Sequence, residues 1–223
     1  MSRTRLKQLM QSPQLKVGHF IVEFVTPGIG HILKQAGCDF VFLDMEHSGF
    51  TFETIKSALR YFEAADLPVI VRVPALENDM LARACDMGAE GLIAPMISTA
   101  AQAQAMVDSV KYFPAGKRGV GLQMAHDNYR IAPVAEALAS ANERTAVICL
   151  IGEFDNPVFV DAMARVVAAA RTHGKALGRV VPNTDQGVAW FRKGFTFCCY
   201  SGDVWVLRDA LSAAVTTLRK GCV

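Results

Sequence analysis

The sequence predicts an α/β fold, a (β/α)8-type TIM barrel with about seven visible strands, formed by one domain over residues 1–223. Short apolar runs alternate with longer segments of helical period, which is typical of parallel strands joined by helical crossovers. A length of 223 residues suits one large domain of this class. The alternative is an open doubly wound sheet. It is less favoured because no G-x-G-x-x-G follows the first predicted strand, where residues 24–28 read FVTPG.

Seven segments are predicted as strands because Val, Ile, Leu, Phe and Cys fill them with few interruptions. Such runs are typical of strands that are buried on both faces of a parallel sheet. The segments are Val17–Phe24, Phe40–Met45, Pro68–Val73, Gly91–Pro95, Thr145–Ile151, Lys175–Val181 and Phe195–Tyr200. A closed barrel of this type has eight strands, so the sequence provides one strand too few.

Amphipathic segments between the strands are predicted as helices. They are Thr51–Ala65, Glu77–Met87, Thr99–Tyr112 and Asn156–His173, with Val204–Leu218 at helical spacing near the C-terminus. Thr51 and Thr99 are suitable N-caps for two of them. Glycines mark candidate helix ends, where a left-handed backbone is common. These are Gly37, Gly88, Gly174 and Gly194.

Composition excludes several classes of partner. With 52% hydrophobic and 20% charged residues, the chain is globular. A net charge of +2 provides no basic face for nucleic acid. No uncharged stretch reaches the roughly 18 residues of a membrane span, and residues 1–16 lack the apolar run of a secretory signal. We therefore expect no nucleic-acid partner and no membrane partner.

The six cysteines are predicted to be structural thiols. They are Cys38, Cys85, Cys149, Cys198, Cys199 and Cys222, and they form no C-x-x-C pair and have no histidine at zinc spacing. Three of them lie inside apolar strand-like runs, where a free cysteine behaves as a small hydrophobic residue. Scattered, unpaired thiols point to a reducing compartment, so the expected location is the cytoplasm.

Chemistry in such a barrel is expected at the carboxyl ends of the strands. The second strand ends in Asp44, Met45, Glu46 and His47, and Arg72 stands at the equivalent height on the third strand. His47 is a candidate general base oriented by an acid such as Asp44. Arg72 would suit a carboxylate or an enolate oxygen. The alternative interpretation is an ordinary strand end with solvated charges. No lysine lies at a strand end, which argues against an imine-forming aldolase.

Four segments follow one another in a specific order along the chain. They are residues 39–47 (DFVFLDMEH), 71–74 (VRVP), 86–96 (DMGAEGLIAPM) and 112–119 (YFPAGKRG), and the series covers about residues 17–121. A weaker match resumes from Gly152 to the C-terminus, notably at residues 194–195 and 201–203. The chain thereby resembles the HpcH/HpaI aldolases of the 4-hydroxy-2-oxoheptanedioate (2,4-dihydroxyhept-2-ene-1,7-dioate) type.

The resemblance implies a class II aldolase that cleaves a 4-hydroxy-2-oxo acid to pyruvate and an aldehyde, in the catabolism of aromatic compounds. A divalent metal (Mg²⁺, Mn²⁺ or Co²⁺) would chelate the keto acid and polarise it. His47 would be the base, paired with Asp44, and Arg72 would stabilise the pyruvate enolate. Asp86 matches a carboxylate that assists the base region across a subunit boundary. The family forms hexamers with C-terminal helices between subunits, so a homo-oligomer is expected.

The sequence departs from the family where the metal ligands should stand. Gly152 occupies the position of the first, a glutamate, and the Gly-x-x-Asp-Leu segment that carries the second is missing. Residues 145–157 read TAVICLIGEFDNP, so a strand leads through a turn straight into a helix. We expect that one β/α unit, roughly 25–35 residues, is absent near residue 152. Glu153 is displaced by one position, which turns a strand residue to the opposite face.

The metal ligands therefore remain unknown, and weak or absent metal binding is expected. Within enzymes, the runner-up is a lyase or epimerase-like relative that acts on another 2-oxo acid through an enolate. From a different class, the alternative is a non-catalytic or metal-deficient relative that binds a keto acid or serves as an assembly partner.

Overall fold

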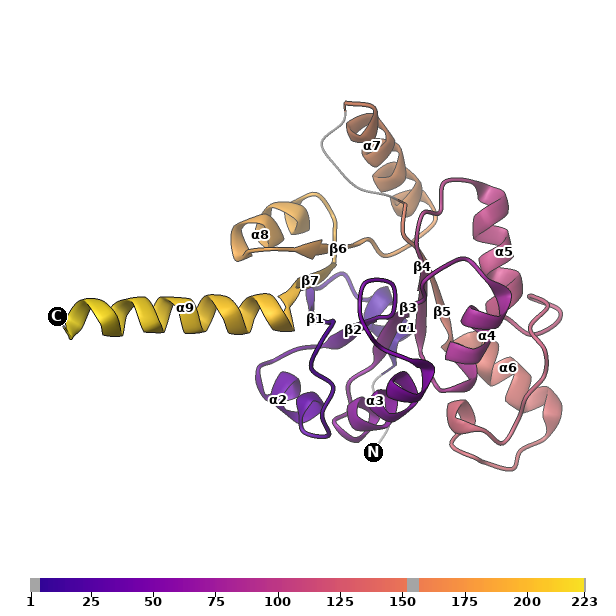
Figure 1. Cartoon of the computed structure of the whole chain (residues 1–223). Coiled ribbons are helices and arrows are strands. Elements are labelled where there is room, and N and C mark those ends of the chain that lie inside the picture. The colour runs from indigo at the N-terminus through magenta and orange to yellow at the C-terminus, as the bar shows by residue number, and fades with distance from the viewer. Residues whose placement is uncertain (1–4, 152–156, 223) are drawn as a thin grey trace.

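The computed structural model describes residues 5–151 and 157–222, and it has seven parallel strands curled into a barrel that is open on one side (Figure 1). The strands are β1 (Lys16–Ile21), β2 (Phe40–Asp44), β3 (Val69–Arg72), β4 (Gly91–Ala94), β5 (Ala146–Cys149), β6 (Gly178–Val181) and β7 (Phe197–Gly202). Their order in the sheet is β5-β4-β3-β2-β1-β7-β6, and each neighbouring pair is parallel. All seven predicted strands are thus confirmed.

Helices follow most strands. They are α1 (Leu6–Gln11), α2 (Ile29–Gln35), α3 (Phe52–Ala64), α4 (Asn78–Asp86), α5 (Ala100–Val110), η1 (Ala125–Asp127), α6 (Val134–Arg144), α7 (Pro157–Thr172), α8 (Thr184–Arg192) and α9 (Asp203–Gly221). No predicted helical segment corresponds to α1 or α6, and α2 and α8 were predicted only through the glycines at their ends, Gly37 and Gly194. The predicted caps are confirmed at Thr51 and Thr99, whose side chains accept backbone N–H bonds from Thr54 and Gln102.

Both faces of the sheet are largely buried over β1, β2, β3 and β4, which explains the nearly continuous apolar runs of these strands, whereas the edge strand β6 is mostly exposed. Successive side chains of a strand point to opposite faces. In β2, Phe40 and Phe42 belong to the cluster inside the barrel, whereas Val41 and Leu43 belong to the cluster beneath the helices. The aromatic interior therefore excludes water from the barrel and leaves its two ends as the places for polar groups.

The amino-terminal end of the barrel is closed by α1. Leu6 is fully buried within the inner cluster, and its backbone N–H donates to Glu90 Oε2 at 3.2 Å. A Cβ atom at Gly91 would lie 2.5 Å from Leu6 Cδ2, so glycine is required for this close approach. Because this end is filled, the accessible end of the barrel is the one at which the strands terminate.

The opening in the barrel lies between β5 and β6, the two outer strands of the sheet. Within the part of the chain that the structure describes, β5 is followed by α7 and no strand lies between β5 and β6. The prediction of one missing β/α unit is consistent with this arrangement. Gly152 and Glu153 lie outside the described residues.

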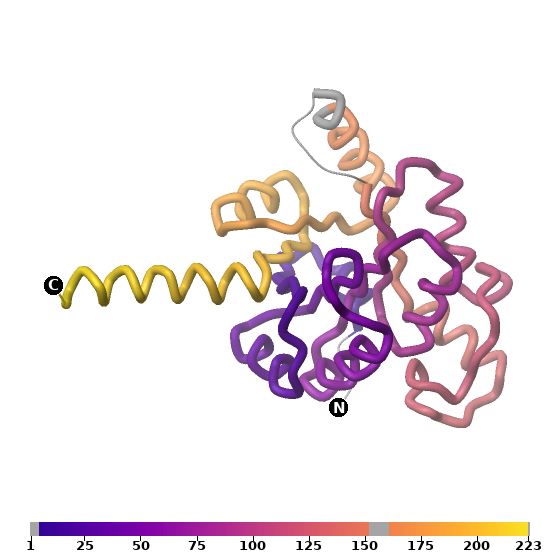
Figure 2. Tube along the Cα trace, viewed as in Figure 1, coloured from indigo at the N-terminus to yellow at the C-terminus, as the bar shows by residue number. Residues whose placement is uncertain are grey.

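The long C-terminal helix α9 extends away from the barrel (Figures 1 and 2). Asp203 is the one residue of α9 that is buried in the described chain. Several large apolar side chains of α9 are exposed, namely Trp205, Val206, Leu207, Leu211, Val215 and Leu218. Beyond its first turn, the helix therefore does not bury these side chains against its own barrel. No described helix is both long and apolar enough to cross a membrane.

Asp203 anchors the base of α9 to the segment after β1. Its carboxylate accepts backbone N–H bonds from Val22, Glu23 and Phe24 at 3.2, 3.0 and 2.7 Å. It also accepts the N–H of Val204 at 2.9 Å, at the first turn of the helix. A single buried carboxylate thus satisfies donors of two segments far apart in sequence.

We predict that Asp203→Ala lowers the free energy of unfolding by about 2 kcal/mol or more, because several backbone donors lose a charged acceptor. Urea denaturation measures the change. Asp209→Ala is the matched control: this carboxylate is exposed on the same helix and pairs with the adjacent Arg208, so its loss should change stability by about 0.5 kcal/mol or less. Equal losses in the two variants would contradict the anchoring role.

Candidate functional site

The candidate site is built at the carboxyl ends of β2 and β3. Asp44 is the last residue of β2 and Arg72 the last residue of β3, and the two are direct partners in the register of the parallel pair. The prediction that they stand at the same height is therefore confirmed. Parallel strands place their final residues at one rim, where loops rather than packed layers surround them.

Asp44 and Arg72 form a bidentate ion pair. Arg72 Nε donates to Asp44 Oδ1 at 2.7 Å and Nη2 donates to Oδ2 at 2.8 Å. The Asp44 side chain is fully buried and that of Arg72 is 12% exposed. A buried carboxylate is tolerated only when it is paired and hydrogen-bonded. The planar fork of arginine meets this need and is held in one orientation.

Asp44 also shapes the loop that follows β2. Its carboxylate accepts the backbone N–H bonds of Glu46 at 2.9 Å and His47 at 3.1 Å. Ser48 Oγ donates to the backbone carbonyl of Asp44. The sequence analysis paired Asp44 with the His47 imidazole, but the bond that the structure records between the two residues uses the His47 backbone. Asp44 therefore positions His47 through the loop.

Glu46 is a site residue that the sequence analysis quoted in the motif but did not assign. Its Oε2 lies 3.1 Å from Arg72 Nη1 and 3.8 Å from His47 Nε2. The second distance is short enough for an ion pair and too long for a hydrogen bond. The sequence did contain a signal for this role: Glu46 stands between Asp44 and His47, in a motif with two carboxylates. Glu46 is thus the carboxylate within 4 Å of the imidazole.

Aromatic rings surround the guanidinium of Arg72. Its Cζ lies 5.5 Å from the ring centroids of both Phe20 and Phe42. These rings belong to the interior cluster of the barrel, so the cation sits where the apolar core ends. Cation–π contacts of this kind add to the ion pairs in fixing the side chain.

A cavity of about 660 Å³ opens at this rim, and three polar side chains line it: Glu46, His47 and Arg72. The His47 side chain is 70% exposed and reaches the cavity. The remaining lining residues are apolar and come from five segments; they are Phe20, Val22, Pro95, Met96, Leu150, Val180 and Trp205. A concave, mostly apolar space with a few convergent polar groups is typical of a small-molecule site.

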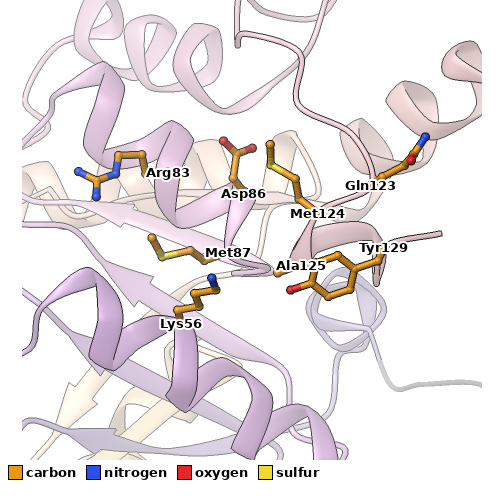
Figure 3. A pocket seen from close by; sticks show the side chains of 8 residues that line it. All are labelled: Lys56, Arg83, Asp86, Met87, Gln123, Met124, Ala125 and Tyr129. Carbon is orange, nitrogen blue, oxygen red and sulfur yellow. The ribbon is translucent and has the colours of Figure 1, made fainter. Parts of the chain in front are cut away.

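Asp86, the fourth predicted site residue, lies elsewhere. It is the last residue of α4 and lines a separate cavity of about 260 Å³ with Met87, Met124 and Tyr129 (Figure 3). The nearly buried guanidinium of Arg118 pairs with its carboxylate. Within this chain, Asp86 and His47 therefore line different cavities.

The described residues do not present a donor set for a divalent metal. Over residues 5–151 and 157–222, no group of three His, Cys, Asp or Glu side chains could hold an ion. At the rim, the carboxylates of Asp44 and Glu46 are both paired with Arg72. Mg²⁺ and similar ions need several oxygen ligands that are available to them. The position of Gly152 and the carboxylates of Glu153 and Asp155 lie outside the described residues.

Five of the six cysteines are not candidate nucleophiles. All six are free thiols. Burial raises the pKa of Cys85 to about 11, and it also raises the pKa of Cys38, Cys149, Cys198 and Cys199. A thiol must be deprotonated to react, so these five remain protonated at neutral pH. Their interpretation as structural residues is supported.

Known proteins share this fold. The HpcH/HpaI aldolase from Desulfitobacterium hafniense superimposes with a TM-score of 0.86 at 24% identity, over 96% of each chain. In sequence, the chain is 33% identical to the 4-hydroxy-2-oxovalerate aldolase of Novosphingobium aromaticivorans over 150 residues. That match covers 67% of this chain and spans little more than half, 55%, of the relative.

A longer alignment shows that a relative has residues without a counterpart in this chain. The 5-keto-4-deoxy-D-glucarate aldolase of Klebsiella pneumoniae is 23% identical over 251 positions, which cover 97% of both chains. The alignment exceeds the 223-residue chain by 28 positions. At least that many residues of the relative have no counterpart here, close to the size of one β/α unit.

The family profile described as HpcH/HpaI aldolase/citrate lyase matches residues 22–153, which is more than half of the chain and includes Asp44, His47, Arg72 and Asp86. The chain therefore belongs to the HpcH/HpaI aldolase/citrate lyase family.

Proposed function

We propose that the cavity at the rim binds a 2-oxo acid and that the chain is a carbon–carbon lyase, which cleaves a 4-hydroxy-2-oxo acid to pyruvate and an aldehyde. The observation that carries the proposal is the guanidinium of Arg72, fixed by Asp44 and facing the same cavity as the His47 imidazole. A planar cation at the end of an apolar space suits the oxygens of a 2-oxo acid. An exposed imidazole beside it suits proton transfer.

In the cleavage direction, a ring nitrogen of His47 takes the proton of the substrate hydroxyl group. The carbon–carbon bond next to that hydroxyl breaks, and the hydroxyl-bearing carbon becomes the aldehyde carbonyl. The bonding electron pair moves into the other fragment as the enolate of pyruvate, and Arg72 stabilises the enolate oxygen. His47 then returns its proton to the enolate carbon, which becomes the methyl group of pyruvate.

Relatives of this class are expected to use a divalent metal, but the described donors do not fit one, and no step above depends on it. This mismatch supports a second candidate function: a metal-deficient relative that binds a keto acid without turnover. The two candidates differ in one measurable property. Exchange of the pyruvate methyl protons with solvent requires a working base, whereas binding alone does not.

We also propose that the chain assembles as a homo-oligomer, a hexamer by resemblance to its family. The exposed apolar side chains of α9 support this proposal, because large apolar patches on a soluble chain mark interaction surfaces. Assembly would also allow Asp86 of one subunit to approach His47 of another. The protonated, unpaired thiols support a reducing compartment such as the cytoplasm.

The first prediction concerns the base. His47→Ala should slow solvent exchange of the pyruvate methyl protons by about 10²–10⁴-fold, the usual contribution of a general base. Proton NMR in deuterated buffer follows the exchange, and thermal melting checks that the fold is retained. His31→Ala is a control at an exposed histidine on α2. A His47→Ala rate within about threefold of the parent would contradict the assignment.

The second prediction concerns the enolate. Arg72→Lys keeps a cation beside Asp44 but loses the planar fork. Its methyl-exchange rate should fall by a larger factor than its affinity for pyruvate, because the enolate charge develops mainly in the transition state. Titration calorimetry gives the affinity. Arg83→Lys, an exposed arginine outside the rim cavity, should alter neither quantity. Equal losses in rate and affinity would indicate ordinary carboxylate binding.

The third prediction concerns assembly. Light scattering at micromolar concentration should give the mass of an oligomer, and Leu211→Glu with Leu218→Glu should shift the protein toward the monomer. Both leucines are more than half exposed and lie two turns apart on one side of α9. Ser212→Glu adds a charge at an exposed polar position and should leave the mass unchanged. A monomeric parent protein would reject the proposal.

A further inference from the structure

The rim cavity has a polar end and an apolar end. Glu46, His47 and Arg72 gather on one side, above the ends of β2 and β3. The apolar end is the part of the lining that comes from β6, from the residue after β5 and from the start of α9. If the proposed function holds, the 2-oxo acid takes the polar end. The aldehyde portion must then occupy the apolar end.

An aromatic wall forms part of the apolar end. Trp205 stacks on Phe20 with ring centroids 6.0 Å apart and an interplanar angle of 12°. The Trp205 side chain is 40% exposed and lines the cavity. A Cβ atom at Gly202 would lie 2.6 Å from the Trp205 ring, so glycine permits the ring to lie over the backbone there. Trp205 therefore offers an indole surface that is already held in place.

Charge at the cavity is limited to the polar end. Among its described lining residues, Arg72 is the cation, and both Asp44 and Glu46 already pair with it. A carboxylate on the aldehyde portion would lie among Val180, Leu150 and Trp205, and the described lining of the cavity places no second cation beside them. Removing an unpaired carboxylate from water is unfavourable, so this lining selects against a second anionic group.

The cavity also has room beyond what a 2-oxo acid needs. Its volume of about 660 Å³ falls within the range that accommodates drug-sized ligands. Leu150 follows β5 and Val180 lies in β6, so the lining reaches both strands that border the opening in the barrel. The apolar end of the cavity therefore lies beside the opening in the barrel.

From these contacts we infer that the aldehyde partner is an uncharged aromatic aldehyde whose ring packs against Trp205. This inference rests on the proposed function for its chemistry. In the addition direction, the methyl carbon of pyruvate loses a proton to His47 and forms a bond to the aldehyde carbon. The aldehyde oxygen receives the proton from His47, which yields a 4-hydroxy-2-oxo acid with an aryl group on its hydroxyl-bearing carbon.

A binding experiment tests the inference without requiring turnover. Trp190→Phe removes one of the two tryptophans and leaves Trp205 as the reporter. In the presence of pyruvate, benzaldehyde should quench Trp205 fluorescence at a concentration at least tenfold lower than succinic semialdehyde, which carries a carboxylate. Equal or tighter binding of the semialdehyde, or no binding of benzaldehyde, would overturn the inference.

A change in charge tests the specificity directly. Met96 is exposed at the rim of the cavity, and Met96→Lys introduces a cation there. The ratio of affinities should shift at least tenfold toward succinic semialdehyde. Ile32→Lys adds the same charge at an exposed position on α2 that lines neither cavity, and it should leave the ratio unchanged. An unchanged ratio in Met96→Lys, or an equal shift in both variants, would refute the role of the uncharged lining.

The proposed function and this inference fail in different ways. If the protein does not exchange the methyl protons of pyruvate but still prefers benzaldehyde, the proposed turnover is rejected. The inference that the site takes an aromatic aldehyde is then retained. Methyl exchange at a normal rate with a preference for the carboxylated aldehyde would keep the lyase and reject the aromatic partner.

Discussion

The buried ion pair between Asp44 and Arg72 is the interaction on which the site depends. It requires that β2 and β3 end in register, and it requires the guanidinium to emerge from an aromatic core at a fixed angle. The same carboxylate binds the backbone of the loop that carries Glu46 and His47. One fully buried acid therefore aligns a cation, a second acid and an imidazole. Loss of Arg72 would leave the fully buried carboxylate of Asp44 without its counterion, so the arrangement is strongly coupled to the fold.

Much of the fold could be predicted because burial on both faces leaves a clear trace in the sequence. Phe40 to Leu43 are all apolar since alternate side chains face the barrel interior and the helices. The rim was predictable for the same reason: Asp44 and Arg72 are the first polar residues after such runs. The role of Glu46 could not be predicted. Its spacing of two residues from Asp44 does not reveal that its side chain also turns toward Arg72. Asp86 could not be placed from the sequence either. It belongs to one of the ordered motifs, but the motif does not indicate that Asp86 lines a different cavity from His47 and Arg72.

The opening in the barrel affects stability and specificity together. Outer strands carry backbone groups that a closed barrel would pair, which makes an open edge a liability unless something covers it. In this chain the opening is bordered by β5 and β6, and residues next to or within those strands line the rim cavity. The resemblance placed the family's metal ligands on this same side. The apolar end of the rim cavity therefore borders the opening between β5 and β6, and Arg72 is the cation among its described lining residues.

The most direct test of this account is titration calorimetry of pyruvate with the metal-free protein in EDTA, followed by the same titration with Mg²⁺, Mn²⁺ or Co²⁺. If Arg72, held by Asp44, receives the keto acid, pyruvate binds in EDTA and the added ions change its affinity by no more than about threefold. A change of that size corresponds to less than 1 kcal/mol. Binding that occurs only after a metal ion is added would contradict the account, since it would place the keto acid on ligands other than the ion pair.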